Sequence, residues 1–155
     1  MANSSEIVRY KQQIMSLLIN NDEVVRLIDN KDIENIEDLI NENIFYYLRV
    51  PDAPEEEKTY ICIEVDIPSA YSKYNNLLRE LIVTVYVITH ERLMATPLGT
   101  RTDLLAAEID KILTSQTVIG KTAMKLWANN ANGIGIKHRC RILSFTVQDT
   151  AKGCG

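Results

Sequence analysis

The spacing of apolar residues in the first fifty positions predicts helices. The apolar residues of the first segment recur every three or four positions: Ile7, Tyr10, Ile14, Leu17 and Leu18. This spacing predicts an amphipathic helix over residues 6–19. Asp22 is expected to cap a second, short helix that ends at Ile28. Helical spacing returns over residues 30–42, so residues 1–50 are expected to form a helical N-terminal part.

Two runs rich in β-branched residues then predict strands. The first run covers residues 60–67 and the second covers residues 79–89. In the second run both alternating faces are largely apolar, so we expect a central strand that is covered on both sides. A long loop over residues 68–76, which contains Tyr71 and Tyr74, is expected to join the two strands.

The second half of the chain predicts one more helix and two more strands. A turn over residues 96–103 leads into a helix that is expected to end near Ser115. Strands are expected over residues 118–128 and 139–149, on either side of an Asn- and Gly-rich turn at 129–135. The expected fold class is α+β, with an antiparallel or mixed four-stranded sheet packed against helices.

The length of 155 residues fits one domain and is too short for two ordinary ones. We therefore expect a single α+β domain over residues 1–155. Its parts are the helical residues 1–50, a sheet-plus-helix core at 59–148 and a flexible tail at 150–155. We expect neither a membrane span nor a signal peptide, because no apolar stretch is long enough for the first and no basic segment precedes an apolar one at the N-terminus.

Charge is distributed unevenly along the chain. Residues 1–70 carry 6 Lys and Arg against 15 Asp and Glu, whereas residues 71–155 carry 11 against 6. Either two solvated faces differ in charge, or opposite ends of the protein attract each other in a head-to-tail assembly. The basic residues, such as Lys137, Arg139 and Arg141, alternate with apolar ones. Because this is no exposed cationic stripe with aromatic stacking partners, we expect no specific binding of nucleic acid.

Few residues suggest catalysis or metal binding. Glu64 and Asp66 lie two apart on a predicted strand, so their side chains share a face and can hold a metal or share a proton. A solvated pair near the strand end is the favoured interpretation. His90 ends the predicted central strand, but a histidine without a defined partner is more often structural.

The cysteines and the known catalytic motifs add no enzymatic signal. Cys62, Cys140 and Cys154 are an odd, scattered set without CxxC spacing, which predicts free thiols in a reducing compartment. Cys140 is expected to be a core residue. The sequence contains no phosphate-binding GxxxxGK[ST], no HExxH and no GxSxG. We expect no enzyme, no cofactor and no metal site.

One segment resembles a known group of proteins. The strand Val83-Thr-Val-Tyr-Val-Ile-Thr-His-Glu is followed by a polar turn and then by Gly-x-Arg-x-Asp at a helix start, formed by Gly99, Arg101 and Asp103. This arrangement resembles the neck and tail-completion proteins of tailed bacteriophages and is most similar to the tail terminator family. The resemblance spans residues 59–148 and rests on this motif and on the order of the elements.

The resemblance implies a structural, non-enzymatic subunit without a cofactor that forms a ring, commonly of six copies. Such a ring sits on the last ring of tail tube protein, ends tail growth and presents a surface to the head–tail connector proteins. It implies a place in the virion, at the neck or tail end, after assembly in the cytoplasm of the bacterial host. Gly99, Arg101 and Asp103 would then build the turn and helix start, and form a candidate subunit contact.

Five further residues are candidates for an interface: Tyr71, Tyr74, Lys137, Arg139 and Arg141. The two tyrosines are expected to act as anchoring aromatic side chains in a docking loop.

Two other classes of function stay open behind the phage structural role. The first is a small ligand-binding or regulatory α+β module with a pocket between sheet and helices. The second, ranked last, is a small hydrolase that uses Glu64, Asp66 and His90 with a metal.

Overall fold

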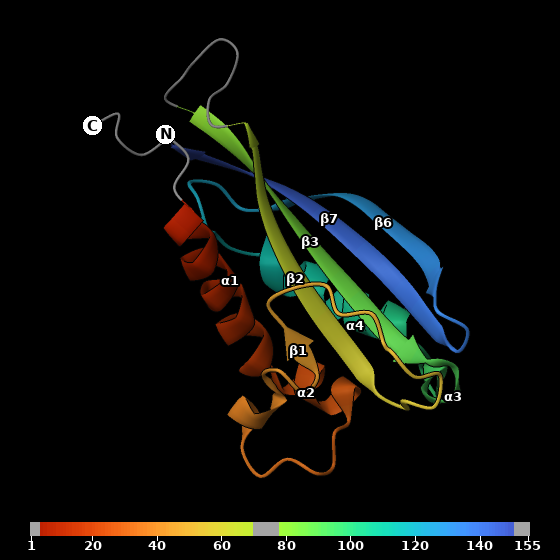
Figure 1. The fold of residues 1–155 in the computed structure, drawn as a ribbon. Helices are drawn as coiled ribbons and strands as arrows, with labels where there is room; N and C mark the ends of the chain where they lie inside the picture. The colour runs from red at the N-terminus through yellow and green to blue at the C-terminus, as the bar shows by residue number, and fades with distance from the viewer. Residues whose placement is uncertain (1–3, 70–77, 151–155) are drawn as a thin grey trace.

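The computed structural model describes residues 4–69 and 78–150 (Figure 1). A five-stranded sheet has the order β1-β2-β3-β7-β6, and a small hairpin, β4–β5, stands apart from it. The sheet consists of β1 (Ile44–Phe45), β2 (Thr59–Ser69), β3 (Leu78–His90), β6 (Lys125–Ile134) and β7 (His138–Thr150). The long strands pair antiparallel and β1 pairs with β2 in parallel, so the sheet is mixed. The predicted α+β fold is confirmed, and β1 is a short addition to the four expected strands.

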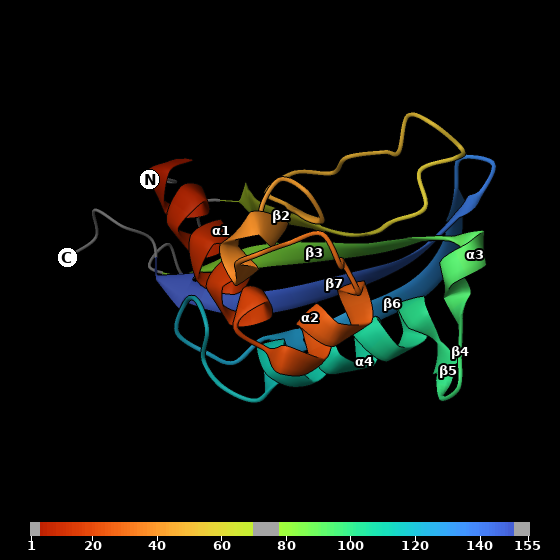
Figure 2. The ribbon, with the colours of Figure 1, turned by 90° about the horizontal axis from the view of Figure 1, so that it is seen from below.

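The helices cover one face of this sheet. They are α1 (Ser4–Ile19), α2 (Asp22–Ile28), the short α3 (Glu91–Met94) and α4 (Arg101–Thr114), while the hairpin consists of β4 (Ala95–Thr96) and β5 (Gly99–Thr100). Figure 2 shows α2 and α4 on one side of the sheet and the long connection from β1 to β2 on the other. Helix α1 lies along the β2 side (Figure 1). In the described part of the chain, no helix is both long and apolar enough to cross a membrane.

One hydrophobic cluster joins the N-terminal helices to the sheet. It combines Ile14 and Leu18 of α1, Leu105 and Ile109 of α4, and the inner residues of β3, all fully buried. The inner residues of β3 are Leu81, Val83, Val85 and Val87. The Tyr10 hydroxyl of α1 donates to Oδ2 of Asp149 on β7 at 2.6 Å. Helix α1 therefore packs on the same sheet as the rest of the chain.

Strand β3 is central, as predicted, but its two faces are not equally covered. The helix-facing residues are completely buried, whereas Ile82, Thr84 and Tyr86 on the opposite face are only half-buried. On that face only the His90 end is closed, where Ile88 packs in a second cluster under the β1–β2 connection. The expectation of full cover on both sides is therefore wrong, because no helix packs against the outer face among the described residues.

The helical spacing over residues 30–42 produces only one turn of 3₁₀ helix, Ile36–Leu39. Short polar side chains compete here with helical hydrogen bonds. The Asp38 carboxylate accepts from the backbone N–H groups of Glu34 and Asn35, at 3.1 and 3.0 Å.

The cap of α2 also differs from the prediction. Asn21, rather than Asp22, accepts the N–H of Val24 at 3.0 Å.

Strand β6 begins later and ends later than predicted. The expected strand over 118–128 begins only at Lys125, and the expected turn over 129–135 is mostly strand, up to Ile134. Strand β6 is an edge strand of the sheet, and most of its side chains are exposed. Asparagines are therefore tolerated where a buried strand would need apolar residues. The chain reverses at residues 135–137 instead, where Gly135 has a φ of 71°.

Several predictions concern residues outside the described ranges. Tyr71 and Tyr74 lie there, as does almost all of the predicted tail at 150–155. Strand β2 continues to Ser69, so residues 68 and 69 of the predicted loop belong to the strand.

Candidate functional site

The Gly-x-Arg-x-Asp motif forms the junction between the β4–β5 hairpin and α4. Gly99 has a φ of +144°, a backbone conformation that favours glycine. The Arg101 guanidinium donates through Nε to the carbonyl of Leu93 at 2.8 Å and through Nη1 to the carbonyl of Leu27. Arg101 therefore binds backbone carbonyls. It joins the start of α4 to α3 and to the end of α2.

Asp103 of this motif links α4 to the sheet. Its Oδ1 accepts from Nε of Arg141 on β7 at 2.8 Å, and Arg141 also donates to Oδ1 of Asn129 on β6 at 2.9 Å. The Arg141 side chain is only 24% exposed. Two predicted site residues, Asp103 and Arg141, thus meet in one internal contact.

The other two predicted basic residues lie at the β6–β7 turn. Arg139 pairs with Glu91 at 2.9 Å and keeps more than half of its side chain exposed. Lys137 is exposed, and within the described ranges its ammonium group has no hydrogen-bond or ion-pair partner. The three basic candidates therefore differ. Arg141 is bound to Asp103 and Asn129, Arg139 forms a surface ion pair with Glu91, and Lys137 is available to a partner.

His90 and His138 come together at one end of the sheet. They are register partners on β3 and β7, and their ring centroids lie 5.1 Å apart in an edge-to-face arrangement. His90 accepts the N–H of Arg92 through Nδ1 at 3.1 Å, so Nε2 carries the proton and donates to the Pro54 carbonyl at 2.8 Å. His138 Nε2 donates to the Glu56 carbonyl at 2.9 Å. Both buried rings fasten the β1–β2 connection to the sheet, which is a structural role.

The same connection is held by an ion pair. Arg49 donates to Glu56 at 3.2 Å, and its guanidinium lies over the rings of Phe45 and Tyr60 at 5.3 and 5.2 Å from their centroids. Burial raises the pKa of Glu56, but Arg49 and Tyr60 outweigh it, so the pKa is lowered overall. Burial, together with Glu56, raises the pKa of Tyr60 to about 12. The Tyr60 hydroxyl is buried, and no described atom lies at both the distance and the angle of a normal hydrogen bond to it.

The candidate carboxylate pair on β2 does not form a metal site. Glu64 binds Lys11 of α1 at 2.7 Å. Asp66 is exposed. No group of three or more His, Cys, Asp or Glu that could hold a metal ion occurs in the described ranges.

Cys62 and Cys140 are buried free thiols. Both belong to the cluster under the β1–β2 connection, as expected for a core position at Cys140. Burial, with a smaller effect from Cys62, raises the pKa of Cys140 to about 12, and burial also raises the pKa of Cys62. These thiols are therefore poor nucleophiles at neutral pH.

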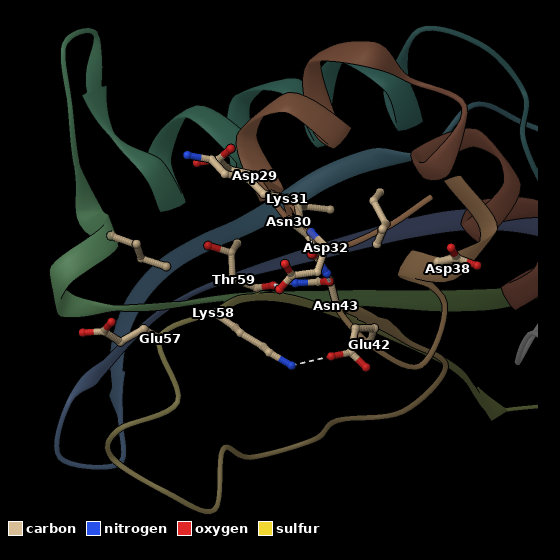
Figure 3. Close-up of a pocket in the computed structure, with 13 residues that line it drawn as sticks. Asp29, Asn30, Lys31, Asp32, Asp38, Glu42, Asn43, Glu57, Lys58 and Thr59 are labelled. Atoms are coloured by element: carbon tan, nitrogen blue, oxygen red, sulfur yellow. Dashed lines mark hydrogen bonds and ion pairs between the residues drawn. The ribbon is translucent and has the colours of Figure 1, made fainter. Parts of the chain in front are cut away.

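A groove of about 660 Å³ lies between the α2–β1 connection and the start of β2 (Figure 3). It draws its walls from residues 28–33, 38, 42–43, 57–59 and 93. Asn43 fastens these segments together: Nδ2 donates to the Thr59 carbonyl at 2.8 Å, and Oδ1 accepts from Asn30 at 2.7 Å.

The groove is acidic with apolar patches. It is lined by five carboxylates and two lysines: Asp29, Asp32, Asp38, Glu42, Glu57, Lys31 and Lys58. Lys58 binds Glu42 within the groove (Figure 3), and Glu57 binds Arg92 at 3.0 Å. Among the described residues the Asp32 carboxylate has no such partner.

The groove could not be predicted from the sequence, because its walls come from five separate stretches of the chain. The only signal was the acidic first half of the sequence, which includes its carboxylates. The exposed turn between β6 and β7 was not predicted either, because the sequence pattern placed the turn at residues 129–135.

The fold as a whole occurs in a known particle. A chain from a solved structure described as the virion of a native gene transfer agent particle superimposes with a TM-score of 0.60 and 16% identity. The match covers 90% of this chain and 93% of that chain. At this identity the likeness shows that the two chains share a fold.

A comparison of the sequence with models of protein families shows the family of this chain. The YomW family model matches residues 11–147, so this chain belongs to the YomW family. No curated protein matches the sequence.

Proposed function

We propose that this protein is a structural component of a phage-like virion. The observation that carries the proposal is the likeness to the gene transfer agent chain, which extends over nearly the full length of both chains. If the two proteins shared only one domain of a larger chain, the match would cover only part of that larger chain. The coverage on both sides instead suggests a subunit of the same kind.

Within the particle, we propose that the protein acts as the tail terminator. Copies would form a ring, commonly of six, on the last ring of tail tube protein, end tube growth and join the tail to the head connector. The Gly99–Arg101–Asp103 motif supports this specific role, because Arg101 and Asp103 fasten α4 to α2, α3 and β7. A ring subunit benefits from such rigidity, since each contact must repeat around the axis.

The proposed role is non-catalytic. It is supported by the positions of the residues that were candidates for catalysis. His90 holds the β1–β2 connection and Glu64 binds Lys11, so two of the three candidates have structural contacts. The third candidate, Asp66, is exposed.

Deletion of the gene in the strain that encodes it tests the tail terminator role. The expected result is tail tubes of uncontrolled length that are not joined to heads, seen by electron microscopy of purified lysates. Complementation with the wild-type gene should restore tails of uniform length. Particles of normal length with joined heads in the deletion strain would contradict this role.

A further inference from the structure

The β6–β7 turn presents an exposed apolar side chain on a rigid base. Ile136 at its tip is 78% exposed, next to the available ammonium group of Lys137. The base is fixed from one side, because the Lys137 carbonyl accepts the N–H of Glu91 at 2.8 Å and Arg139 binds the Glu91 carboxylate at 2.9 Å. His138 between them is buried and donates to the Glu56 carbonyl. A tip held in this way loses little conformational entropy on binding.

The groove of about 660 Å³ has the complementary properties. Ile28, Ile33 and Leu93 give it apolar walls, and its five carboxylates outnumber its two lysines. An isoleucine beside a lysine matches both features, since the apolar side chain reaches the walls while the ammonium group meets the carboxylates.

The groove lies beside the start of β2 and the tip follows the end of β6, and Glu57 of the groove also lines a second hollow together with Lys137. Thr59, which lines the groove, pairs with Thr89, Thr89 pairs with Arg139, and Arg139 pairs with Gly133 near the tip. These residues form one row across β2, β3, β7 and β6. A neighbouring copy placed beside the sheet, by rotation about an axis roughly parallel to the strands, brings its tip level with the groove.

We propose that the β6–β7 turn of one copy docks into the groove of the next copy, with Ile136 as the apolar anchor and Lys137 facing Asp32. This contact rests on the proposed function, because it is the contact between neighbours in a ring. It is heterologous, since one surface meets a different surface, and repetition of such a contact closes a ring when the rotation allows it. It also gives the uneven charge of the chain a role in assembly.

The tip fills only part of a stable interface. Specific interfaces bury roughly 800 Å² on each partner, which is more than one turn supplies. Ile136 and Lys137 therefore act as the central anchor, and the flanking surfaces of both copies complete the contact.

A disulfide trap tests the contact directly. In a Cys154→Ser background, one protein carries Lys137→Cys and a second carries Asp32→Cys, the two positions that face each other in the proposed contact. The two are mixed and oxidised, and the products are separated on a non-reducing gel. The expected product is a covalent dimer that forms only in the mixture. One chain carrying both substitutions is expected to form a ladder of higher oligomers. The buried Cys62 and Cys140 should stay reduced.

Leu98→Cys is the matched control for Lys137→Cys. Leu98 is also exposed, at 78%, but lies on the β4–β5 turn, so it should give at most a background level of dimer with Asp32→Cys. Dimer yield equal to that of Lys137→Cys, or no dimer from either, would overturn the proposed contact.

A charge exchange tests the same contact without cysteines. Lys137→Glu is expected to weaken self-association measured by sedimentation about tenfold, and Asp32→Lys added to it should restore most of the loss. Without recovery in the double variant, the Lys137–Asp32 pairing is wrong. Failure of this contact can be distinguished from failure of the proposed function. If particles retain the protein although no cross-link forms, the contact between neighbours lies elsewhere. If the cross-link forms but the protein does not associate with particles, the protein assembles with itself outside the virion.

Discussion

Gly120 lies in a turn whose backbone leaves no room for a side chain. Its φ is +69°, and an added Cβ would lie 2.6 Å from the carbonyl oxygen of Gln148 and 3.2 Å from Cγ2 of Val147. The following residue, Lys121, donates its N–H to the same carbonyl at 2.7 Å. We expect Gly120→Ala to lower the free energy of unfolding by about 2–4 kcal/mol, from backbone strain and displacement of β7. Urea denaturation measures this value.

Gly135 provides a matched control at a similar backbone angle. Its φ is +71°, but an added Cβ would meet no atom within 4 Å. Gly135→Ala should therefore cost only the strain of the left-handed conformation, about 1–2 kcal/mol. Equal losses in the two variants would show that the close approach to Gln148 has no energetic effect.

At the scale of elements, the β1–β2 connection depends on the Arg49–Glu56 pair. Because the pKa of Glu56 is lowered in the folded protein, the pair stabilises the fold above the ordinary pKa of a glutamate, and this stabilisation is lost as pH falls through the lowered value. Arg49→Met keeps the apolar contact with Phe45 and Tyr60 but removes the charge. We expect its free energy of unfolding to decrease less steeply than that of the wild type between about pH 5 and pH 3.

Arg26→Met is the control for this pH dependence. Arg26 pairs with Glu23 on the surface of α2, where both side chains are exposed and solvent screens the interaction. Its curve of unfolding free energy against pH should run nearly parallel to that of the wild type. If Arg49→Met and Arg26→Met behave alike, the partly buried pair contributes no more than a surface pair.

Elements with a strong periodic pattern could be predicted from the sequence, and elements set by local polar contacts could not. Strand β3 and helix α4 have apolar residues at clear spacings, and both were found. Over residues 30–42 the spacing was helical as well, but the Asp38 carboxylate binds the backbone and limits the helix to one turn. Strand β6 has no buried face to mark it, because it pairs with β7 at the sheet edge.

The candidate site was predictable only in part for a similar reason. The motif at Gly99, Arg101 and Asp103 is contiguous and could be recognised, yet the partners of Arg101 are the carbonyls of residues far away in the chain. His90 and His138 meet because β3 and β7 pair in register, which no spacing in the sequence reveals. The groove requires the same long-range arrangement of several connections.

At the scale of the whole molecule, acidic and basic residues separate along the chain, and the groove and the β6–β7 turn are two different surfaces. Both features favour a subunit that meets its neighbours through unlike surfaces. They agree with the proposed role in a virion.

The position of the protein in purified particles distinguishes a tail terminator from other virion subunits. A copy with an epitope tag at its C-terminus can be labelled with gold-conjugated antibody and viewed by electron microscopy. We expect one focus of label on each particle, at the junction between head and tail. Label along the whole tail, or purified particles without any label although the tagged copy supports normal assembly, would contradict this expectation.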